Sequence, residues 1–439
     1  MAAAAQRDLA ATLGALRSGE LDLRRRIDEL AASFDEREAR VLSLMPEPNR
    51  FERLHREAEA LLAKHPAPAS RPALFGALLG VKDVFRVDGF ETRAGSRLPP
   101  STFAGPEASS VTRLRRAGAL VLGKTVSTEF AYFAPGPTRN PRDSARTPGG
   151  SSSGSAAAVG AGLCDVALGT QTIGSVTRPA SFCGVVGCKP SFGRVPTDGI
   201  IPLAPGLDHV GWFAAEVAGA RLVAAELLEA APSSPGSPEG TRPRLAIPIG
   251  PYLDRADADG RKHFEGACER LRSRGYEIAD LPAMLDFDEI EARHRRIVAA
   301  ETAAVHANWF AEFRDLYAPQ TIELIERGQK IPTEQLEIDL GGRSALRREL
   351  AALLDGAGCQ AWISPSARGV APLGLASTGD PVMNLPWTQA GLPTLGIPAG
   401  LGQSGLPIGL QLAARFGDDA PLFAWAEAIE RTLQKGCPT

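Results

Sequence analysis

Residues 149–159 read GGSSSGSAAAV, and a second glycine-rich turn at residues 169–175 reads GTQTIGS. Each turn carries a serine, Ser151 or Ser175, among glycines, which allow the backbone to approach a substrate closely. Upstream of both turns, a short apolar segment ends at Lys82. One lysine and two turn-mounted serines are the parts of a hydrolase that acylates serine without a histidine, so the pattern predicts an enzyme that cleaves amide-like bonds.

The lysine needs a particular protonation state for this chemistry. A serine hydroxyl is a poor nucleophile at neutral pH and requires a base within hydrogen-bonding distance. A lysine can be that base only when it is neutral, and burial in apolar surroundings disfavours its ammonium form. Lys82 follows the apolar residues 78–81 and is expected to enter a core. The alternative is a lysine at a strand end that forms an ion pair, with its neighbour Asp83 as the first candidate.

The turn around Ser175 offers several backbone N–H groups in succession. If these groups point at one oxygen they form an oxyanion hole, in which loss of a single donor typically costs about 10²–10³ in rate. Pro179 suits the first turn of a following helix, whose dipole adds to the stabilisation. The alternative is a glycine-rich connection that merely packs closely. The predicted donors are Thr172, Ile173, Gly174 and Ser175.

A second serine hydrolase motif overlaps the first turn. Residues 150–154, GSSSG, match the G-x-S-x-G turn of α/β-hydrolases, with Ser152 as the nucleophile. That motif needs a strand immediately before the turn, and residues 144–149, SARTPG, make a poor strand. It also needs an acid and a histidine downstream. No recognisable motif surrounds the downstream histidines, which are His209, His263, His294 and His306. We therefore disfavour this alternative.

Nucleotide and nucleic-acid binding are not expected. A phosphate-binding loop requires G-x-x-x-x-G-K-[ST], and neither the run after Gly149 nor residues 123–125, GKT, completes that spacing. The net charge of −3 and the lack of a long basic segment give no electrostatic footprint for nucleic acid.

The composition is that of a globular protein, with 439 residues, 44% hydrophobic and 23% charged. No apolar run reaches the roughly 18 residues that span a bilayer, and the N-terminus lacks a signal-peptide pattern, so a cytoplasmic protein without a membrane partner is expected. The six cysteines and six histidines have spacings that suit neither a disulfide framework nor a metal site. We expect buried thiols and no metal.

The order of local patterns predicts an α/β protein. Residues 1–65 read as an N-terminal helical segment, and residues 66–439 as one large domain in which apolar runs alternate with helical stretches. Residues 286–355 are charged and helical, like an insertion or cap, and the Pro-rich residues 231–238 read as a surface connection. Helices are expected at 109–117, 153–162, 257–274 and 420–433, and strands or core segments at 119–123, 166–169, 244–248, 276–278, 361–365 and 393–398.

The two serine turns belong to a longer stretch that resembles the signature of the amidase signature family. The family pattern runs G-G-S-S-G-G-S-A-A-A-V, then G-T-D-T-G-G-S-I-R, then P-A-x-F-C-G-V-V-G-x-K-P-S/T-x-G-R. This chain matches it at residues 149–159, 169–175 and 179–194, with further likeness at 80–83 (GVKD), 123–125, 129–131 (EFA) and 405–412 (GLPIGLQL). The resemblance covers about residues 72–434. It implies a central mixed β-sheet sandwiched by helices.

The resemblance also implies a catalytic triad, Ser–cis-Ser–Lys, at Ser175, Ser151 and Lys82. Ser175 would attack the carbonyl while Ser151 passes its proton to neutral Lys82, and the peptide bond at Ser151 would be cis. The same relay would protonate the leaving nitrogen, and water would clear the acyl-enzyme. No cofactor or metal is implied. The implied partner is a small-molecule amide, ester or carbamate, and the implied assembly is a monomer or homodimer.

Three residues beside the nucleophile depart from the family pattern. Gln171 stands where the family has Asp, Ile173 where it has Gly, and Thr177 where it has Arg. The joint loss of an acid and a base suggests that neutral groups replace an internal ion pair. Ile173 adds bulk beside Ser175 and lessens the likeness to the glutamine amidotransferase subunits of the family, so a role linked to tRNA is not expected.

These departures bear on the substrate. Family members also cleave esters, anilides, ureas and carbamates, and the neutral pair with nearby aromatic residues favours an apolar or aryl substrate, including an aryl carbamate (urethane). The alternative for each aromatic candidate is that it packs in the core instead of lining the substrate pocket. In a different class, the chain is a non-catalytic or partner-dependent protein on the same scaffold, with Ile173 spoiling the oxyanion hole. Candidate substrate-binding residues are Phe130, Tyr132, Phe133, Gly149, Gly150, Gln171, Met383 and Trp387.

Overall fold

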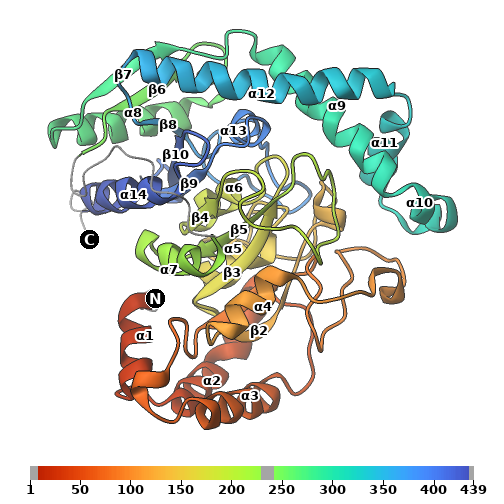
Figure 1. Ribbon diagram of the computed structural model, residues 1–439, viewed down its shortest axis with the longest axis vertical. Coiled ribbons are helices and arrows are strands. Elements are labelled where there is room, and N and C mark those ends of the chain that lie inside the picture. The colour runs from red at the N-terminus through yellow and green to blue at the C-terminus, as the bar shows by residue number, and fades with distance from the viewer. Residues whose placement is uncertain (1–7, 229–241, 435–439) are drawn as a thin grey trace.

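The computed structural model describes residues 8–228 and 242–434 (Figure 1). In that part of the chain one mixed sheet has ten strands, in the order β2-β1-β3-β5-β4-β9-β10-β8-β6-β7. The strands are β1 (Leu78–Lys82), β2 (Leu120–Thr125), β3 (Val166–Gln171), β4 (Val186–Lys189), β5 (His209–Ala214), β6 (Leu245–Ile249), β7 (Ile278–Pro282), β8 (Ala361–Pro365), β9 (Thr394–Leu401) and β10 (Pro407–Ala414).

The sheet is parallel at its two ends and antiparallel in its centre. β1 pairs in parallel with β2 and β3, and β6 pairs in parallel with β7 and β8. Between these ends, β3, β5, β4, β9, β10 and β8 pair in antiparallel fashion. The single mixed sheet between helices confirms the predicted fold class.

Three helices form the N-terminal segment, namely α1 (Leu9–Ser18), α2 (Leu23–Val41) and α3 (Arg50–Lys64). Figure 1 shows them grouped at the end of the sheet that carries β2. These helices lie within the segment 1–65 for which the sequence predicts helices. The remaining core helices are α4 (Ser109–Arg116), α5 (Ser153–Gly160), α6 (Thr177–Cys183), α7 (Val217–Leu227), α8 (Ala258–Ser273), α13 (Leu385–Gln389) and α14 (Asp419–Gln434).

Helix α5 explains the small residues that follow Ser151. Its residues 153–159 are buried, and the helix contacts β1, β2, β3, β5 and α6. A Cβ at Gly154 would collide with the carbonyl oxygen of Ser43 and the backbone of Val126, so only glycine fits there. The glycine-rich sequence therefore places the start of α5, and the serine before it, deep in the sheet layer.

Residues 286–355 form an arm of four helices, α9 (Phe287–Val305), α10 (Ala307–Phe313), α11 (Pro319–Gly328) and α12 (Thr333–Gly356). In Figure 1 this arm extends from the side of the sheet that carries β6, β7 and β8. α9 packs against α11, α12 and α13. Through α13 the arm reaches the core beside the turn that carries Ser175.

Local details differ from the sequence-based expectations at a few points. The predicted strand at 276–278 begins only at Ile278, because Gly275 turns the chain with φ of +84° and Tyr276 packs into the core.

The predicted surface connection at residues 231–238 lies outside the described residues. Five of the cysteines, 164, 183, 188, 268 and 359, are free and buried, as expected. In residues 8–228 and 242–434, no helix combines the length and apolar character that crossing a membrane requires.

Candidate active site

Strand β1 delivers Lys82 into the core beside Ser151. The Lys82 side chain is fully buried, and its Nζ donates hydrogen bonds to Ser151 Oγ at 2.7 Å and to Thr170 Oγ1 at 2.8 Å. Burial lowers the pKa of Lys82 to about 7, and the charge of Asp208 raises it in part. A lysine with this pKa is neutral in a large fraction of molecules near neutral pH, as a general base requires.

The neighbouring carboxylate of Asp83 has another partner. Asp83 Oδ1 lies 2.8 Å from the Nζ of Lys124 on β2, and both side chains are buried. Lys82 is therefore not the ion-pair partner of Asp83, and this alternative for Lys82 is wrong. The two lysines have separate environments, one with a carboxylate and one with two hydroxyl groups.

Ser151 lies in a turn with unusual backbone geometry. The peptide bond between Gly150 and Ser151 is cis, and Gly149 has φ of +84°. The Ser151 carbonyl accepts a hydrogen bond from the N–H of Thr128 at 3.2 Å. Ser151 thus faces Lys82 with its hydroxyl while its backbone is attached to the loop that begins at Thr128.

The alternative nucleophile, Ser152, is fully buried. Its hydroxyl donates to the carbonyl of Thr170 at 3.2 Å, and the chain before the turn is not a strand. The α/β-hydrolase arrangement therefore does not fit this turn.

The carbonyl groups of the Ser175 turn are held by two side chains from other segments. His294 of α9 is buried, which lowers its pKa to about 3, and its Nε2 lies 3.0 Å from the carbonyl oxygen of Thr172. The neutral ring can therefore donate to this oxygen. Thr388 of α13 donates to the carbonyl of Ile173 at 2.7 Å. With these carbonyls fixed, the turn has one orientation.

Unlike its carbonyls, the N–H groups of this turn are unpaired within the described chain. Among the described residues, the N–H groups of Ile173, Gly174 and Ser175 have no hydrogen-bond acceptor. The Ser175 hydroxyl likewise has no partner there, and Ser175 is 7% exposed. A nucleophile with free N–H groups beside it is the arrangement that an oxyanion hole needs.

Neutral hydrogen bonds occupy the positions where the family pattern has an acid and a base. Gln171 Oε1 accepts from the N–H of Val176 at 2.8 Å and of Thr177 at 3.1 Å, at the start of α6. Its Nε2 donates to Thr388 Oγ1 at 2.9 Å. Asn384 Nδ2 donates to Thr177 Oγ1 at 2.9 Å. Gln171 is fully buried and supports the turn through these contacts.

Asp208 lies behind the turn. It accepts hydrogen bonds from Thr172 Oγ1 and from the N–H groups of Leu203 and Ala204, the latter at 2.9 and 3.1 Å. Burial raises the pKa of Asp208 to about 6. The Asp208 carboxyl group is thus bonded to the Ser175 turn through Thr172 and also raises the pKa of Lys82.

The aromatic and apolar candidates divide into two groups by their burial. Phe130, Met383 and Trp387 are fully buried in the core; Phe130 stacks on Tyr317, which lies between α10 and α11. Tyr132 and Phe133 are half-buried, with ring centroids 4.4 Å apart.

The half-buried pair is tied to the Ser151 turn through Thr128. The Thr128 hydroxyl donates a hydrogen bond to the Tyr132 carbonyl at 2.7 Å. The Thr128 backbone N–H donates to the Ser151 carbonyl. The structure therefore brings Tyr132 and Phe133 to the loop beside Ser151 and places the other three aromatic and apolar candidates in the core.

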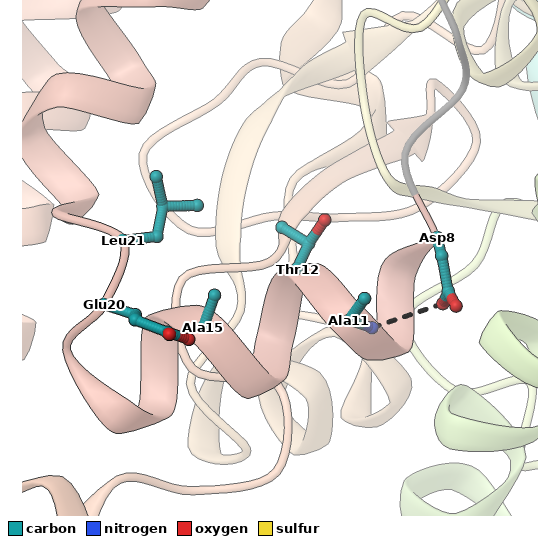
Figure 2. A pocket seen from close by; sticks show the side chains of 6 residues that line it. All are labelled: Asp8, Ala11, Thr12, Ala15, Glu20 and Leu21. Carbon is teal, nitrogen blue, oxygen red and sulfur yellow. Dashed lines mark hydrogen bonds between the residues drawn. The ribbon is translucent and has the colours of Figure 1, made fainter.

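A shallow surface depression lies on α1 and the turn after it, as Figure 2 shows. It contains none of the candidate site residues, and its one marked interaction is the N-terminal cap of α1, in which Asp8 accepts from the Ala11 N–H. We assign it no role. In the described part of the chain, no three His, Cys, Asp or Glu side chains are grouped in a way that would hold a metal ion.

Sequence reasoning missed several residues that support the site. Thr170 could have been found, since it lies on the strand that leads into the Ser175 turn. Arg178 could also have been found, since it lies between two matched parts of the signature, three residues after Ser175. The others come from segments with no motif of their own, and they are Asp208, His294, Asn384 and Thr388.

Comparison with known proteins finds one family over most of the chain. Residues 49–423 match the family described as Amidase. The chain is 33% identical to a glutamyl-tRNA(Gln) amidotransferase subunit of Nitratidesulfovibrio vulgaris (strain DP4), over 97% of this chain and 96% of that protein.

Solved structures show the same fold over nearly the whole chain. A crystal structure of an amidase superimposes with a TM-score of 0.85 at 31% identity, covering 97% of this chain and 100% of the other. The peptide amidase from Stenotrophomonas maltophilia superimposes with a TM-score of 0.80 at 27% identity, covering 98% and 97%. The chain therefore belongs to the amidase family.

Proposed function

We propose that this protein hydrolyses carboxylic amides through a serine acyl-enzyme, with Ser175 as nucleophile, Ser151 as proton relay and Lys82 as base. The observation that carries the proposal is the 2.7 Å contact between Ser151 Oγ and the Nζ of a fully buried lysine. Family membership and the free hydroxyl of Ser175 support the same assignment.

In the acylation step, Ser175 Oγ attacks the carbonyl carbon. Its proton passes to Ser151 Oγ while the Ser151 proton passes to Lys82 Nζ, which becomes an ammonium. The carbonyl oxygen gains a negative charge. The N–H groups of the turn, with Ile173 and Gly174 at its centre, donate hydrogen bonds to that oxygen.

In the next step the proton transfer runs in the opposite direction. Lys82 returns a proton through Ser151 to the leaving nitrogen, the C–N bond breaks, and the amine departs. Water enters, gives a proton to the same relay, and attacks the Ser175 ester. Expulsion of the acid restores the serine hydroxyl, so the cycle closes without a cofactor or a metal.

The proposed substrate is a small molecule with an apolar or aryl group, such as an anilide, an ester or an aryl carbamate. Ile173 lies beside the nucleophile and is 9% exposed, and Gln171 and Thr177 contribute no charge. Tyr132 and Phe133 lie on the loop bonded to Ser151. A monomer or homodimer suffices, because every group in the relay comes from one chain.

A second candidate is a protein that depends on a partner subunit for its activity. It is favoured by the 33% identity to an amidotransferase subunit over 97% of this chain. The two candidates differ in what the isolated chain does, since a self-sufficient amidase turns over simple amides and a partner-dependent subunit does not.

The test is aniline release from a matched anilide and aryl carbamate, with the isolated wild-type chain and Ser175→Ala. Hydrolysis of either compound by wild type and not by the variant supports the proposal, and the ratio of the two rates begins to define the substrate class. If wild type hydrolyses neither compound, the proposal of a small aryl substrate is rejected. Wild-type activity in Ser175→Ala rejects the nucleophile.

A further inference from the structure

Arg178 is a buried cation with three hydrogen bonds to backbone carbonyls and one longer contact, at 3.4 Å, to the Thr378 hydroxyl. It is the second residue of α6 and is 1% exposed. One terminal nitrogen donates to the Gly150 carbonyl at 2.6 Å. The other donates to the carbonyls of Thr378, at 2.6 Å, and Gly379.

The charge of this guanidinium has no direct counter-ion. Within the described chain, no carboxylate lies at ion-pair distance from Arg178; Asp380 acts on it only at longer range, and its carboxylate pairs with Arg368 at 3.4 Å. Burial lowers the pKa of Arg178 to about 10, so it remains charged at neutral pH. A buried cation is costly unless its donors are satisfied. Both terminal nitrogens of Arg178 are hydrogen-bonded, whereas its Nε has no partner in the described chain, so the compensation comes from the carbonyls that the terminal nitrogens bind.

These contacts connect the two serine turns. The Gly150 carbonyl belongs to the peptide that carries Ser151, and Arg178 lies three residues after Ser175, in the first turn of α6, which begins at Thr177. A planar guanidinium with two terminal nitrogens binds two sets of carbonyls in a fixed geometry, which an ammonium cannot do.

We propose that Arg178 is a positioning residue that fixes the distance between Ser151 and Ser175, and that it couples this distance to the loop carrying Thr378 and Gly379. The inference rests on the proposed function, since it assigns a role in proton transfer between these serines. Arg178 does not touch the substrate or the reacting atoms.

The competing interpretation is that Arg178 only anchors the loop. Arg146 provides a matched control, because its guanidinium donates to the Ala371 carbonyl of the same loop at 2.7 Å and does not contact Gly150. A loop anchor predicts equal effects of the two arginines, whereas a positioning role predicts an effect of Arg178 alone.

The experiment measures the labelling of Ser175 by an aryl phosphonate, with the maximal rate constant and the half-saturating concentration determined separately. For Arg178→Met we expect the rate constant to fall about 10²-fold, as expected for a misplacement of about 1 Å, with the half-saturating concentration within about threefold of wild type. Arg178→Lys should fall about tenfold, since an ammonium holds fewer carbonyls. Arg146→Met should stay within about threefold, and thermal unfolding verifies that each variant is folded.

The outcomes separate this inference from the proposed function. Absence of labelling in wild type, or equal labelling of Ser175→Ala, rejects the proposed function. If wild type is labelled at Ser175, a rate constant within threefold of wild type in Arg178→Met overturns the positioning role, as does an equal loss in Arg146→Met. If Arg178→Met does not fold, Arg178→Lys decides by the same criterion.

Discussion

Lys82 Nζ lies 2.7 Å from Ser151 Oγ, at the point where a strand end meets the turn before a buried helix. The relationship depends on the small residues of α5, which allow that helix to lie against β1. Burial removes the ammonium's solvation and lowers the pKa of Lys82 to about 7. The same packing that builds the core therefore favours the neutral amine that the proposed base requires.

The pH dependence of activity should report Lys82. The neutral amine is the active form, so kcat/KM is expected to rise as the pH increases through about 7 and to level off above it. Because the charge of Asp208 raises the pKa of Lys82, Asp208→Asn should shift this rise to lower pH. An unchanged pH profile in the variant would contradict this electrostatic link.

Gly174 should not tolerate a side chain. A Cβ there would collide with the Asn384 side chain and displace the turn that carries the free N–H groups. We expect Gly174→Ala to lower kcat about 10²-fold, by analogy with loss of an oxyanion donor. Gly341→Ala is the control, since its Cβ meets nothing within 4 Å and lies in helix α12. It should leave kcat unchanged.

A charge at position 171 should destabilise the fold. Gln171→Glu keeps the shape but removes the amide that donates to Thr388, and it buries a carboxylate without a cation. We expect the free energy of unfolding to fall by about 1–3 kcal/mol or more, measured by urea unfolding. Gln320→Glu, at an exposed position of α11, should change it by less than about 0.5 kcal/mol. Equal stability of the two variants would refute the buried network.

The Asp83–Lys124 pair gives a stability prediction independent of catalysis. Asp83→Asn leaves the buried Lys124 without its carboxylate and should cost about 3–5 kcal/mol of unfolding free energy. The double variant with Lys124→Met removes the stranded charge and should recover most of the loss. If the double variant is as unstable as the single one, the ion pair is not the source of the effect.

The residues that the sequence predicted lie in continuous motifs. Lys82, Ser151 and Ser175 each follow or occupy a recognisable local pattern, and the structure places the first two in direct contact. The supporting groups, such as His294 and Thr388, come from helices far along the chain and contact the turn only through tertiary packing. No local pattern identifies such partners.

The substrate pocket was harder to predict for a different reason. An aromatic residue near a motif can face either a pocket or the core, and its spacing in the sequence is the same in both cases. Phe130 and Trp387 are fully buried, whereas Tyr132 and Phe133 are half-buried. Phe130 packs against His306 and Tyr317 of the helical arm. Trp387 packs against Tyr252 and Trp362. These tertiary contacts separate the two groups.

The most direct test of the mechanism is to locate the acyl group. A carbamate with a phenol leaving group is suited to this, because attack by Ser175 breaks its C–O bond and releases the phenol, and donation from the retained nitrogen makes the carbamoyl–serine ester slow to hydrolyse. After acid quenching, mass spectrometry of the digested protein should find the carbamoyl group on Ser175 in wild type and nowhere in Ser175→Ala. A carbamoyl group on Ser152, or steady turnover without any modified serine, would contradict the acyl-enzyme account.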